Sequence, residues 1–336
     1  MPGKVQPAMK AAVRDRYGGP EVVRLEEIPT PVPSDGDILV RVHAASVNRA
    51  DLDVLAPRPG FLRPFLGLRG PRNRRLGSDV AGTVEAVGPG VTRVKPGDRV
   101  FADLFPFGQG SFAEFVAAPE RAFLPIPDGI DFETAATLPH SAILALQGLR
   151  DRSGRTVQPG DRVLIGGASG NTGPFAVQIA KSLGAEVTGV CRTEKVDFVR
   201  SLGADHVIDY RSTDFTATGE RYDWILDADS HHSILRSRRA LRPGGRYVTL
   251  GGGALDLVQG VVVGPLAGLF GSRRAGLMLW WKPFHPPDIA TLTDLVISGA
   301  VRPAIDARYP LADVVEALRR VDAGTTRGKV LVTVAP

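Results

Sequence analysis

The feature that most constrains this chain is a glycine-containing turn at residues 167–173, placed between an apolar run at 163–165 and an amphipathic segment. The run predicts a buried strand, and apolar residues at helical spacing after the turn predict a helix. Ala168, Gly170 and Gly173 fit the spacing Gly/Ala-x-Gly-x-x-Gly, which permits a tight turn and close approach of a pyrophosphate to the backbone. A glycine turn without a ligand is the alternative. The pattern favours a dinucleotide site whose candidate residues are Ala168, Ser169, Gly170, Asn171, Thr172 and Gly173.

The composition is that of an ordinary globular protein, with 43% hydrophobic and 23% charged residues. At 336 residues the chain is long enough for two domains. It has no run of about 18 apolar residues, so we expect no membrane span. Residues 1–10 lack the apolar core of a secretory signal, and we therefore expect a cytoplasmic protein. Cys191 is the single cysteine, which excludes an intrachain disulfide and a four-cysteine zinc site.

The chain is basic, with a formal charge of +5 and a pI near 9.5. Part of this charge lies in one loop, which contains Arg58, Arg63, Arg69, Arg72, Arg74 and Arg75. The loop could attract an anionic partner or frame an active-site entrance, or it could be a solvated loop in an arginine-rich chain. We find no helix-turn-helix, aromatic RNA-binding sheet or zinc finger, and we expect no specific nucleic-acid partner.

Two kinds of pattern divide the chain. Between residues 10 and 120, short apolar or alternating runs punctuated by glycine and proline predict strands of a barrel-like domain. Residues 133–149 predict a helix, and 254–285 are glycine-rich and apolar without a clear element. From residue 160 strands alternate with helical patterns, which predicts a doubly wound parallel sheet. Helices are expected at 174–183, 194–202, 232–241, 287–299 and 311–321, and a last strand at 329–334.

Ordered motifs carry a resemblance to a known family. They are SVNRAD (46–51), GSDVAGTVEAVGPGVTRVKPGDRV (77–100), GSFAEF (110–115), GASGNTG (167–173), SLGADHVIDY (201–210), LRPGGRYVTLGG (241–252) and RGKVLV (327–332). With these motifs the chain resembles the medium-chain dehydrogenase/reductase superfamily, specifically its zinc-free quinone oxidoreductase branch. The resemblance implies an α/β protein with a GroES-like β-rich domain at 1–122 and 300–336. It also implies a Rossmann domain, with a doubly wound parallel sheet, at 123–299, and residues 1–8 as an unstructured extension.

The resemblance also bears on the metal. Zinc alcohol dehydrogenases of the superfamily bring a cysteine and a His-Glu pair to zinc, whereas this chain has Asn48 in the cysteine position and Ser78 and Asp79 in place of the pair. Such residues do not supply the nitrogen and thiolate ligands of tetrahedral zinc. We therefore expect no metal, and hydride delivery to a quinone or an activated carbon–carbon double bond. The charge that develops there needs only hydrogen-bond donors or water.

Two residues are candidates for the reaction itself. The resemblance places Asn48 at the cofactor edge, where a neutral amide can orient a carboxamide or donate to a carbonyl; a turn asparagine is the alternative. His140 lies in a segment that runs alongside the nicotinamide in this family, and it is either a proton donor or a structural histidine. Relatives often have a threonine where this chain has Leu144. Asp51 is expected to brace the local backbone.

The end of the second Rossmann strand argues for NADPH. An NAD enzyme usually has Asp or Glu there, whereas this chain has Cys191 followed by Arg192, Thr193 and Lys195. Cations beside a missing carboxylate suit a 2′-phosphate, although a solvated helix start is the alternative. The resemblance places Tyr210 near the same phosphate.

The glycine pair Gly251 and Gly252 follows the strand RYVTL. We expect it to let the backbone pass close to the nicotinamide, with a plain glycine turn as the alternative. The resemblance further suggests a homodimer paired through the Rossmann edge near 270–282, which would bury Trp280 and Trp281.

Together these features predict an NADPH-dependent, zinc-independent reductase that transfers hydride to a quinone or an α,β-unsaturated carbonyl. One alternative is a zinc-free carbonyl or enoyl-thioester reductase. Another is a dinucleotide-binding protein of low turnover with a structural or RNA-associated role.

Overall fold

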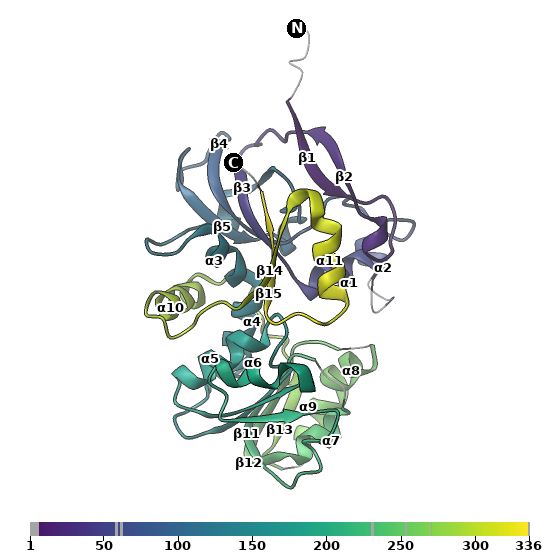
Figure 1. Ribbon diagram of the computed structural model, residues 1–336, viewed down its shortest axis with the longest axis vertical. Coiled ribbons are helices and arrows are strands. Elements are labelled where there is room, and N and C mark those ends of the chain that lie inside the picture. Colours follow the sequence, from purple (N-terminus) through teal and green to yellow (C-terminus); the bar gives the residue numbers. More distant parts are fainter. Residues whose placement is uncertain are drawn as a thin grey trace. The chain divides into compact units, whose positions relative to one another are not determined.

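The computed structural model describes residues 7–57, 60, 63–229, 232–252, 254–269 and 271–334 (Figure 1). Arg58, which belongs to the arginine-rich loop that the sequence singled out, lies outside these residues, as does most of the predicted N-terminal extension. The chain divides into two compact units: residues 1–140, 283–289 and 305–336 form the first, and residues 141–282 and 290–304 form the second.

The first unit extends further along the chain than the expected boundary at residue 122. Helix α3 (Phe132–Thr137) contacts strands β3 (Asp37–Val47) and β4 (Asp79–Val87), which are central strands of the first unit. This packing assigns residues 123–140 to the first unit. The second unit therefore begins directly after His140.

The first unit is built on a seven-stranded sheet in the order β14-β15-β3-β4-β5-β7, with β6 paired to β3. The remaining strands are β5 (Arg99–Asp103), β6 (Phe115–Pro119), β7 (Leu124–Pro125), β14 (Ile305–Pro310) and β15 (Lys329–Thr333), and β1 (Ala8–Val13) with β2 (Arg24–Pro29) forms a separate pair. The β-rich character predicted for residues 10–120 is thus confirmed. Strand β15 runs antiparallel to β3, so residues near 330 join the sheet begun near 40.

Helices of the first unit cover this core. Helix α11 (Val314–Asp322), which the sequence predicted, contributes Val314, Ala317, Leu318 and Val321 to the same buried cluster as the sheet. Helices α1 (Arg49–Leu55) and α2 (Arg63–Leu66) had no sequence signal that we recognised. Helix α10 (Pro286–Ile297), which belongs to the second unit from Ala290 onward, matches the helix predicted at 287–299.

The second unit contains a six-stranded sheet in which every strand is parallel to its neighbours. Its order is β10-β9-β8-β11-β12-β13, and the order reverses between β8 and β11. The bounds are β8 (Arg162–Gly166), β9 (Glu186–Cys191), β10 (His206–Asp209), β11 (Tyr222–Asp227), β12 (Leu241–Thr249) and β13 (Arg274–Leu277). This is the predicted doubly wound sheet, in which ligands bind outside the carboxyl ends of the strands where the order reverses.

Three helices connect these strands as expected: α5 (Gly173–Ser182), α6 (Val196–Ser201) and α7 (Ile234–Arg239). The helix predicted at 133–149 is instead interrupted. It consists of α3, a π-helical turn at Leu138–Ala142 and α4 (Ile143–Gly148). Pro139 lies in the π-helical turn, and a proline has no N–H to donate within a helix, which favours such a local widening.

Residues 254–285 hold structure that the sequence did not indicate. Helix α8 (Ala254–Val258), a π-helical turn (Gln259–Val263) and α9 (Gly264–Gly268) precede β13. A Cβ on Gly264 would lie 2.4 Å from the carbonyl oxygen of Ala275, so the helix packs directly on the backbone of β13. The glycines that hid the helical pattern are what permit this close packing.

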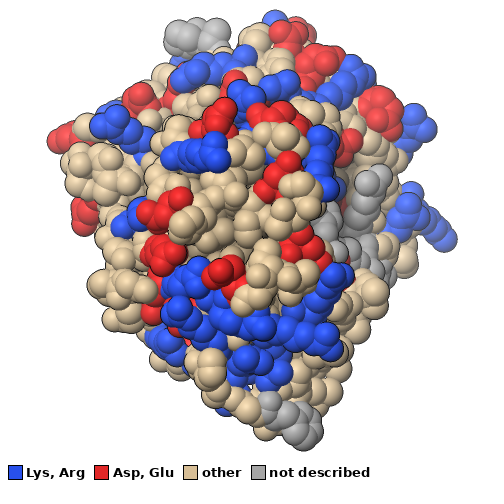
Figure 2. All heavy atoms as spheres, turned by 60° about the horizontal axis from the view of Figure 1, so that its bottom comes forward, with Lys and Arg blue, Asp and Glu red and all other residues tan. Residues whose placement is uncertain are grey.

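Basic side chains gather on one face of the molecule, as the lower half of Figure 2 shows. In the second unit, Arg162 and Arg274 are the first residues of the parallel strands β8 and β13, and Arg274 pairs in register with Arg246 of β12. Several are balanced locally: Arg246 contacts Asp151 at 2.7 Å, and Arg242 contacts Asp223 at 2.9 Å. This basic edge is opposite the carboxyl edge, where the glycine turn lies.

We predict that Gly173→Ala destabilises the protein by about 1–3 kcal/mol, because overpacking forces the backbone apart. A Cβ at Gly173 would lie 2.2 Å from the carbonyl oxygen of Gly167. Thermal unfolding should show the loss. Gly170→Ala is the matched control, since its Cβ would meet that same oxygen at an ordinary 3.5 Å. Equal losses in the two variants would contradict the close-packing argument.

Candidate functional site

The first unit holds a cluster of polar side chains that are almost completely buried. Its members are Ser46, Asn48, Asp51, Ser78, Asp79, Asp103, His140 and Lys329, of which none is more than 8% exposed. Strand register brings part of the cluster together, because Ser46 of β3 lies opposite Asp79 of β4, and Asp79 lies opposite Asp103 of β5. Cross-strand partners share one face of a sheet, so these three side chains form a row.

Asn48 lies at the centre of this cluster, immediately before α1. Its backbone N–H donates to Oδ2 of Asp51 at 2.7 Å, which closes the first turn of the helix. Its side-chain nitrogen donates to Oδ2 of Asp79 at 2.9 Å, with Oγ of Ser78 at 3.4 Å. Its side-chain oxygen accepts from Nζ of Lys329 at 2.6 Å. Since an ammonium only donates, the amide oxygen must face Lys329.

Lys329, the first residue of β15, is a fully buried lysine. Its Nζ lies 3.3 Å from Oδ2 of Asp79, an atom that also accepts from Oγ of Ser46 at 2.7 Å. Burial lowers the pKa of Lys329 and raises that of Asp79, and the attraction between the two groups opposes both effects. We did not identify Lys329 from the sequence. The available signal was a lysine directly before the apolar run VLV of a predicted strand.

Asp51 carries the clearest electrostatic perturbation. Its Oδ1 accepts from Oγ of Ser78 at 3.0 Å, and it braces the backbone of Asn48 as expected. Burial raises the pKa of Asp51 to about 7, with the charge of Asp79 adding to the increase. Near neutral pH this carboxyl group is therefore partly protonated.

His140 is paired with a carboxylate. Its Nδ1 lies 2.9 Å from Oδ2 of Asp103, whose Oδ1 accepts from the backbone N–H of Phe105 at 2.9 Å. Burial alone lowers the pKa of His140, but the attraction and hydrogen bond of Asp103 outweigh it, so the net pKa is raised. The pair favours an imidazolium. Asp103 was not predicted, because only the register of β5 brings it near the cluster.

The positions that the resemblance compares with zinc ligands do not fit that metal. They hold the amide of Asn48, the hydroxyl of Ser78 and the carboxylate of Asp79, and the ammonium of Lys329 lies against two of them. Zinc sites require thiolate, imidazole or carboxylate ligands in a tetrahedral array. In the described part of the chain, no group of three or more His, Cys, Asp and Glu side chains is suited to a metal ion.

The second unit forms the predicted glycine turn at the carboxyl end of β8. Gly167 has φ of 68°, which favours glycine, and the N–H of Gly170 donates to its carbonyl at 3.0 Å. Helix α5 begins at Gly173, where a Cβ would collide with the turn. The structure therefore brings the residues from Ala168 to Gly173 to a helix N-terminus with the close packing that a dinucleotide pyrophosphate requires.

The sequence analysis missed a hydrogen-bonded pair at this edge, Asp227 and Tyr247. Asp227 ends β11, next to β8, and its Oδ2 accepts from the hydroxyl of Tyr247 at 2.8 Å. An aspartate at the carboxyl end of a strand beside the reversal in strand order was the available signal. Nearby, Oγ1 of Thr249 donates to the carbonyl of Gly251 at 2.8 Å, and Gly252 has φ of 146°.

The residues predicted to select NADPH meet at the ends of β9 and β10. Nε of Arg192 donates to the hydroxyl of Tyr210 at 2.7 Å, and Tyr210 is 39% exposed. Oγ1 of Thr193 donates to Asp209 at 2.6 Å. Lys195 is 4% exposed, so its side chain belongs to the interior of the unit.

Cys191, which replaces the usual carboxylate, is 2% exposed. Burial raises the pKa of its thiol to about 11, and it is therefore a neutral side chain at the end of β9. It therefore has no negative charge with which to bind a ribose hydroxyl, and none that would repel a phosphate.

Outside these clusters, Phe284 is 9% exposed and packs edge-on against Phe101 with ring centroids 5.2 Å apart, so it is a core residue. Nε1 of Trp280 donates to the carbonyl of Gln147 at 3.3 Å. In the arginine-rich loop, Arg74 forms ion pairs with Asp15 and Glu26 at 2.6 and 3.0 Å.

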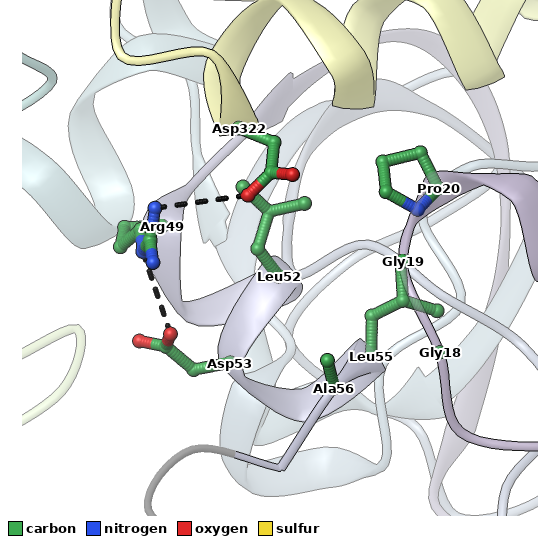
Figure 3. Close-up of a pocket in the computed structure, with 9 residues that line it drawn as sticks. All are labelled: Gly18, Gly19, Pro20, Arg49, Leu52, Asp53, Leu55, Ala56 and Asp322. Carbon is green, nitrogen blue, oxygen red and sulfur yellow. Dashed lines mark ion pairs between the residues drawn. The ribbon is translucent and has the colours of Figure 1, made fainter.

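A shallow pocket lies elsewhere on the first unit, between the loop at 18–20, helix α1 and the end of α11 (Figure 3). Arg49 is the one basic residue among those that line it, and it contacts Asp53 at 3.4 Å and Asp322 at 3.9 Å. The two carboxylates satisfy this cation, so the pocket offers little to an anion.

Comparison with known proteins agrees with this arrangement. A family model described as an alcohol dehydrogenase GroES-like domain matches residues 34–128, and one described as a zinc-binding dehydrogenase matches residues 202–332. None of the helices in the described residues has the length and apolar character needed to cross a membrane.

Relatives match along nearly the whole chain. A mitochondrial NAD(P)H oxidoreductase of Bos taurus, RTN4IP1, is 33% identical over 97% of this chain and 89% of its own length. A chloroplast envelope quinone oxidoreductase homolog of Arabidopsis thaliana is 30% identical over 99% of both chains. The structure of a quinone oxidoreductase from Coxiella burnetii superimposes with a TM-score of 0.87 at 30% identity, over 98% of this chain and 100% of that one. The chain therefore belongs to the medium-chain dehydrogenase/reductase superfamily, in the branch that contains the quinone oxidoreductases.

Proposed function

We propose that this protein is an NADPH-dependent, zinc-independent reductase that transfers hydride to a quinone or an α,β-unsaturated carbonyl. The observation that carries the proposal is the ammonium of Lys329 bound to Asn48 and Asp79, at the positions compared with zinc ligands. A built-in cation in that place leaves hydrogen bonds and proton transfer as the means of stabilising the reaction.

His140 is the proposed proton donor. NADPH would supply the hydride, which adds to carbon and leaves negative charge on the acceptor oxygen. The raised pKa of His140 keeps a proton on the imidazole for this charge, and Asp103 stabilises the imidazolium before transfer. The hydride carries two electrons and one hydrogen, so reduction of a quinone to the hydroquinone needs one further proton, which His140 would supply and then regain from water.

Asn48 is proposed to act at the nicotinamide edge. Its side-chain nitrogen already donates within the cluster, and its oxygen orientation is fixed by Lys329. These contacts support a role in which the oxygen of Asn48 accepts a hydrogen bond from the carboxamide N–H of the cofactor.

A panel of acceptors tests the activity. NADPH oxidation should be measured with quinones, enones, aldehydes and enoyl thioesters, and we expect turnover with the first two. Turnover confined to aldehydes or enoyl thioesters would favour the zinc-free carbonyl or enoyl-thioester reductase. Tight NADPH binding without oxidation by any acceptor would sink the enzymatic proposal.

NADPH selectivity is expected to depend on Arg192 and Tyr210. Removing a charge-assisted hydrogen bond costs about 1.5–3 kcal/mol, so Arg192→Ala should raise the NADPH dissociation constant by on the order of 10- to 100-fold. Tyr210→Phe should have a smaller effect, and NADH binding should be nearly unchanged in both. Fluorescence titration with each cofactor measures this.

Arg200→Ala is the control for that experiment, because Arg200 is an exposed arginine of α6 that forms an ion pair with Asp197 at 3.2 Å. It should bind both cofactors as the unmodified protein does. Equal losses of NADPH and NADH affinity in Arg192→Ala would argue against a 2′-phosphate contact.

The pH dependence of turnover should follow His140. Because its pKa is raised above 6.5, kcat should be highest below that pKa and fall as pH rises through it. The same sign holds for stability: the His140–Asp103 contribution is complete below the unfolded pKa of about 6.5 and is lost as pH rises through the folded pKa.

His140→Gln should lower kcat by about 10²–10⁴-fold and remove this pH limb. His206→Gln, which changes an exposed histidine of β10, is the control and should leave the profile intact. A pH limb that persists in His140→Gln would assign proton donation to another group.

We further propose a homodimer formed through the edge of the second unit. Strand β13 ends its sheet, and the helical segment before it exposes apolar side chains: Leu255, Val258, Val261, Val262, Leu266 and Leu269 are 45–75% exposed. Leu266→Glu should therefore shift the protein toward monomer in light scattering. Leu68→Glu, at a 74% exposed position of the first unit, should not. A monomeric unmodified protein would contradict the dimer.

The cytoplasm remains the proposed location. The single, buried cysteine forms no disulfide, which is usual for proteins in a reducing compartment.

A further inference from the structure

The buried lysine at the start of β15 has more contacts than charge compensation requires. Its Nζ approaches Asn48 at 2.6 Å, closer than it approaches Asp79 at 3.3 Å. If the lysine served only to neutralise a carboxylate, the carboxylate would be expected to be its nearer partner. The shorter contact is to the side chain proposed to act at the cofactor.

An asparagine side chain has two ends of nearly equal size and opposite hydrogen-bonding character. The hydroxyl of Ser78 does not decide its orientation, because it can accept or donate, and a protonated carboxyl group can do the same. An ammonium has no acceptor, so Lys329 excludes the flipped amide at the oxygen end, as the ionised carboxylate of Asp79 does at the nitrogen end.

We propose that Lys329 is a positioning residue for hydride transfer, which fixes the oxygen of the Asn48 amide in the orientation needed to hold the nicotinamide carboxamide. Lys329 acts through Asn48 and does not itself contact the cofactor or the acceptor. This inference rests on the function proposed for Asn48 above.

Both groups of the pair come from the first unit, whereas the dinucleotide turn belongs to the second. Loss of Lys329 should therefore reduce kcat while leaving NADPH affinity nearly unchanged. A misplaced reacting group commonly costs on the order of 10- to 100-fold in rate. The deuterium isotope effect with NADPH labelled at the transferred position should rise, because the hydride step becomes slower than the others.

The variants are Lys329→Met, Asp79→Asn and the two combined, with Lys95→Met as the matched control at an exposed lysine of the first unit. Lys329→Met alone leaves a buried carboxylate without its cation, which threatens folding. The combined variant removes both charges and keeps the test possible. We expect kcat to fall by about 10- to 100-fold in Lys329→Met and to stay low in the combined variant.

Asn48→Ala supplies the second half of a double-mutant cycle. If Lys329 acts through Asn48, adding Lys329→Met to Asn48→Ala should cause no further loss of kcat. Additive losses would overturn the proposal. Recovery of kcat in the combined Lys329→Met and Asp79→Asn variant would also overturn it, because that result would mean that Lys329 only neutralises the charge of Asp79.

A readout without turnover separates this inference from the proposed activity. The side-chain amide resonances of Asn48, assigned by their loss in Asn48→Ala, should be sharp in the unmodified protein and broadened or doubled in the combined variant. An unchanged pair of resonances would refute the positioning role even in a protein that reduces none of the acceptors. Absence of turnover in the unmodified protein, with the resonances behaving as expected, would instead count against the proposed function alone.

Discussion

The ion pair between Lys329 and Asp79 is the interaction on which the buried cluster depends. Three carboxyl groups, Asp51, Asp79 and Asp103, lie in the interior with two basic groups, Lys329 and His140. An unpaired buried charge costs several kcal/mol, so full ionisation would leave one carboxylate uncompensated. Burial raises the pKa of Asp51 to about 7, so protonation of this carboxyl group offsets the imbalance in part at neutral pH and more fully below it. With Asp51 protonated, the cluster contains two ion pairs and no net charge.

This balance is reached with a cation that belongs to the chain itself. A zinc ion would bring its own charge to a set of ligands, whereas here the cation is part of the chain and is held by the pairing of β15 with β3. The same backbone pairing that closes the sheet delivers Nζ to Asn48 and Asp79. The register of β15 therefore determines whether a cation reaches the cluster. A slip of one residue in β15 would turn Lys329 to the opposite face of the sheet.

The sequence predicted those parts of the site that are local in the chain. The glycine turn, the strand before it and the helix after it are within about twenty residues, and spacing alone indicated them. Arg192 and Tyr210 were paired through the resemblance, and the parallel register of Cys191 with Asp209 brings them together. Lys329 and Asp103 were missed because their neighbours are set by strand register far along the chain. The helices at 254–268 were missed because glycines serve packing there and interrupt the helical pattern.

The division of the chain into units has a consequence for its synthesis. The first unit begins at the N-terminus but needs residues 305–334 to complete its sheet, while residues 141–282 form most of the second. During translation the nucleotide-binding unit can thus fold before the unit that precedes it, reversing the usual N-terminal-first order. Until Lys329 emerges from the ribosome, Asp79 lacks its cation, and the nascent first unit must keep that carboxylate in water or protonated.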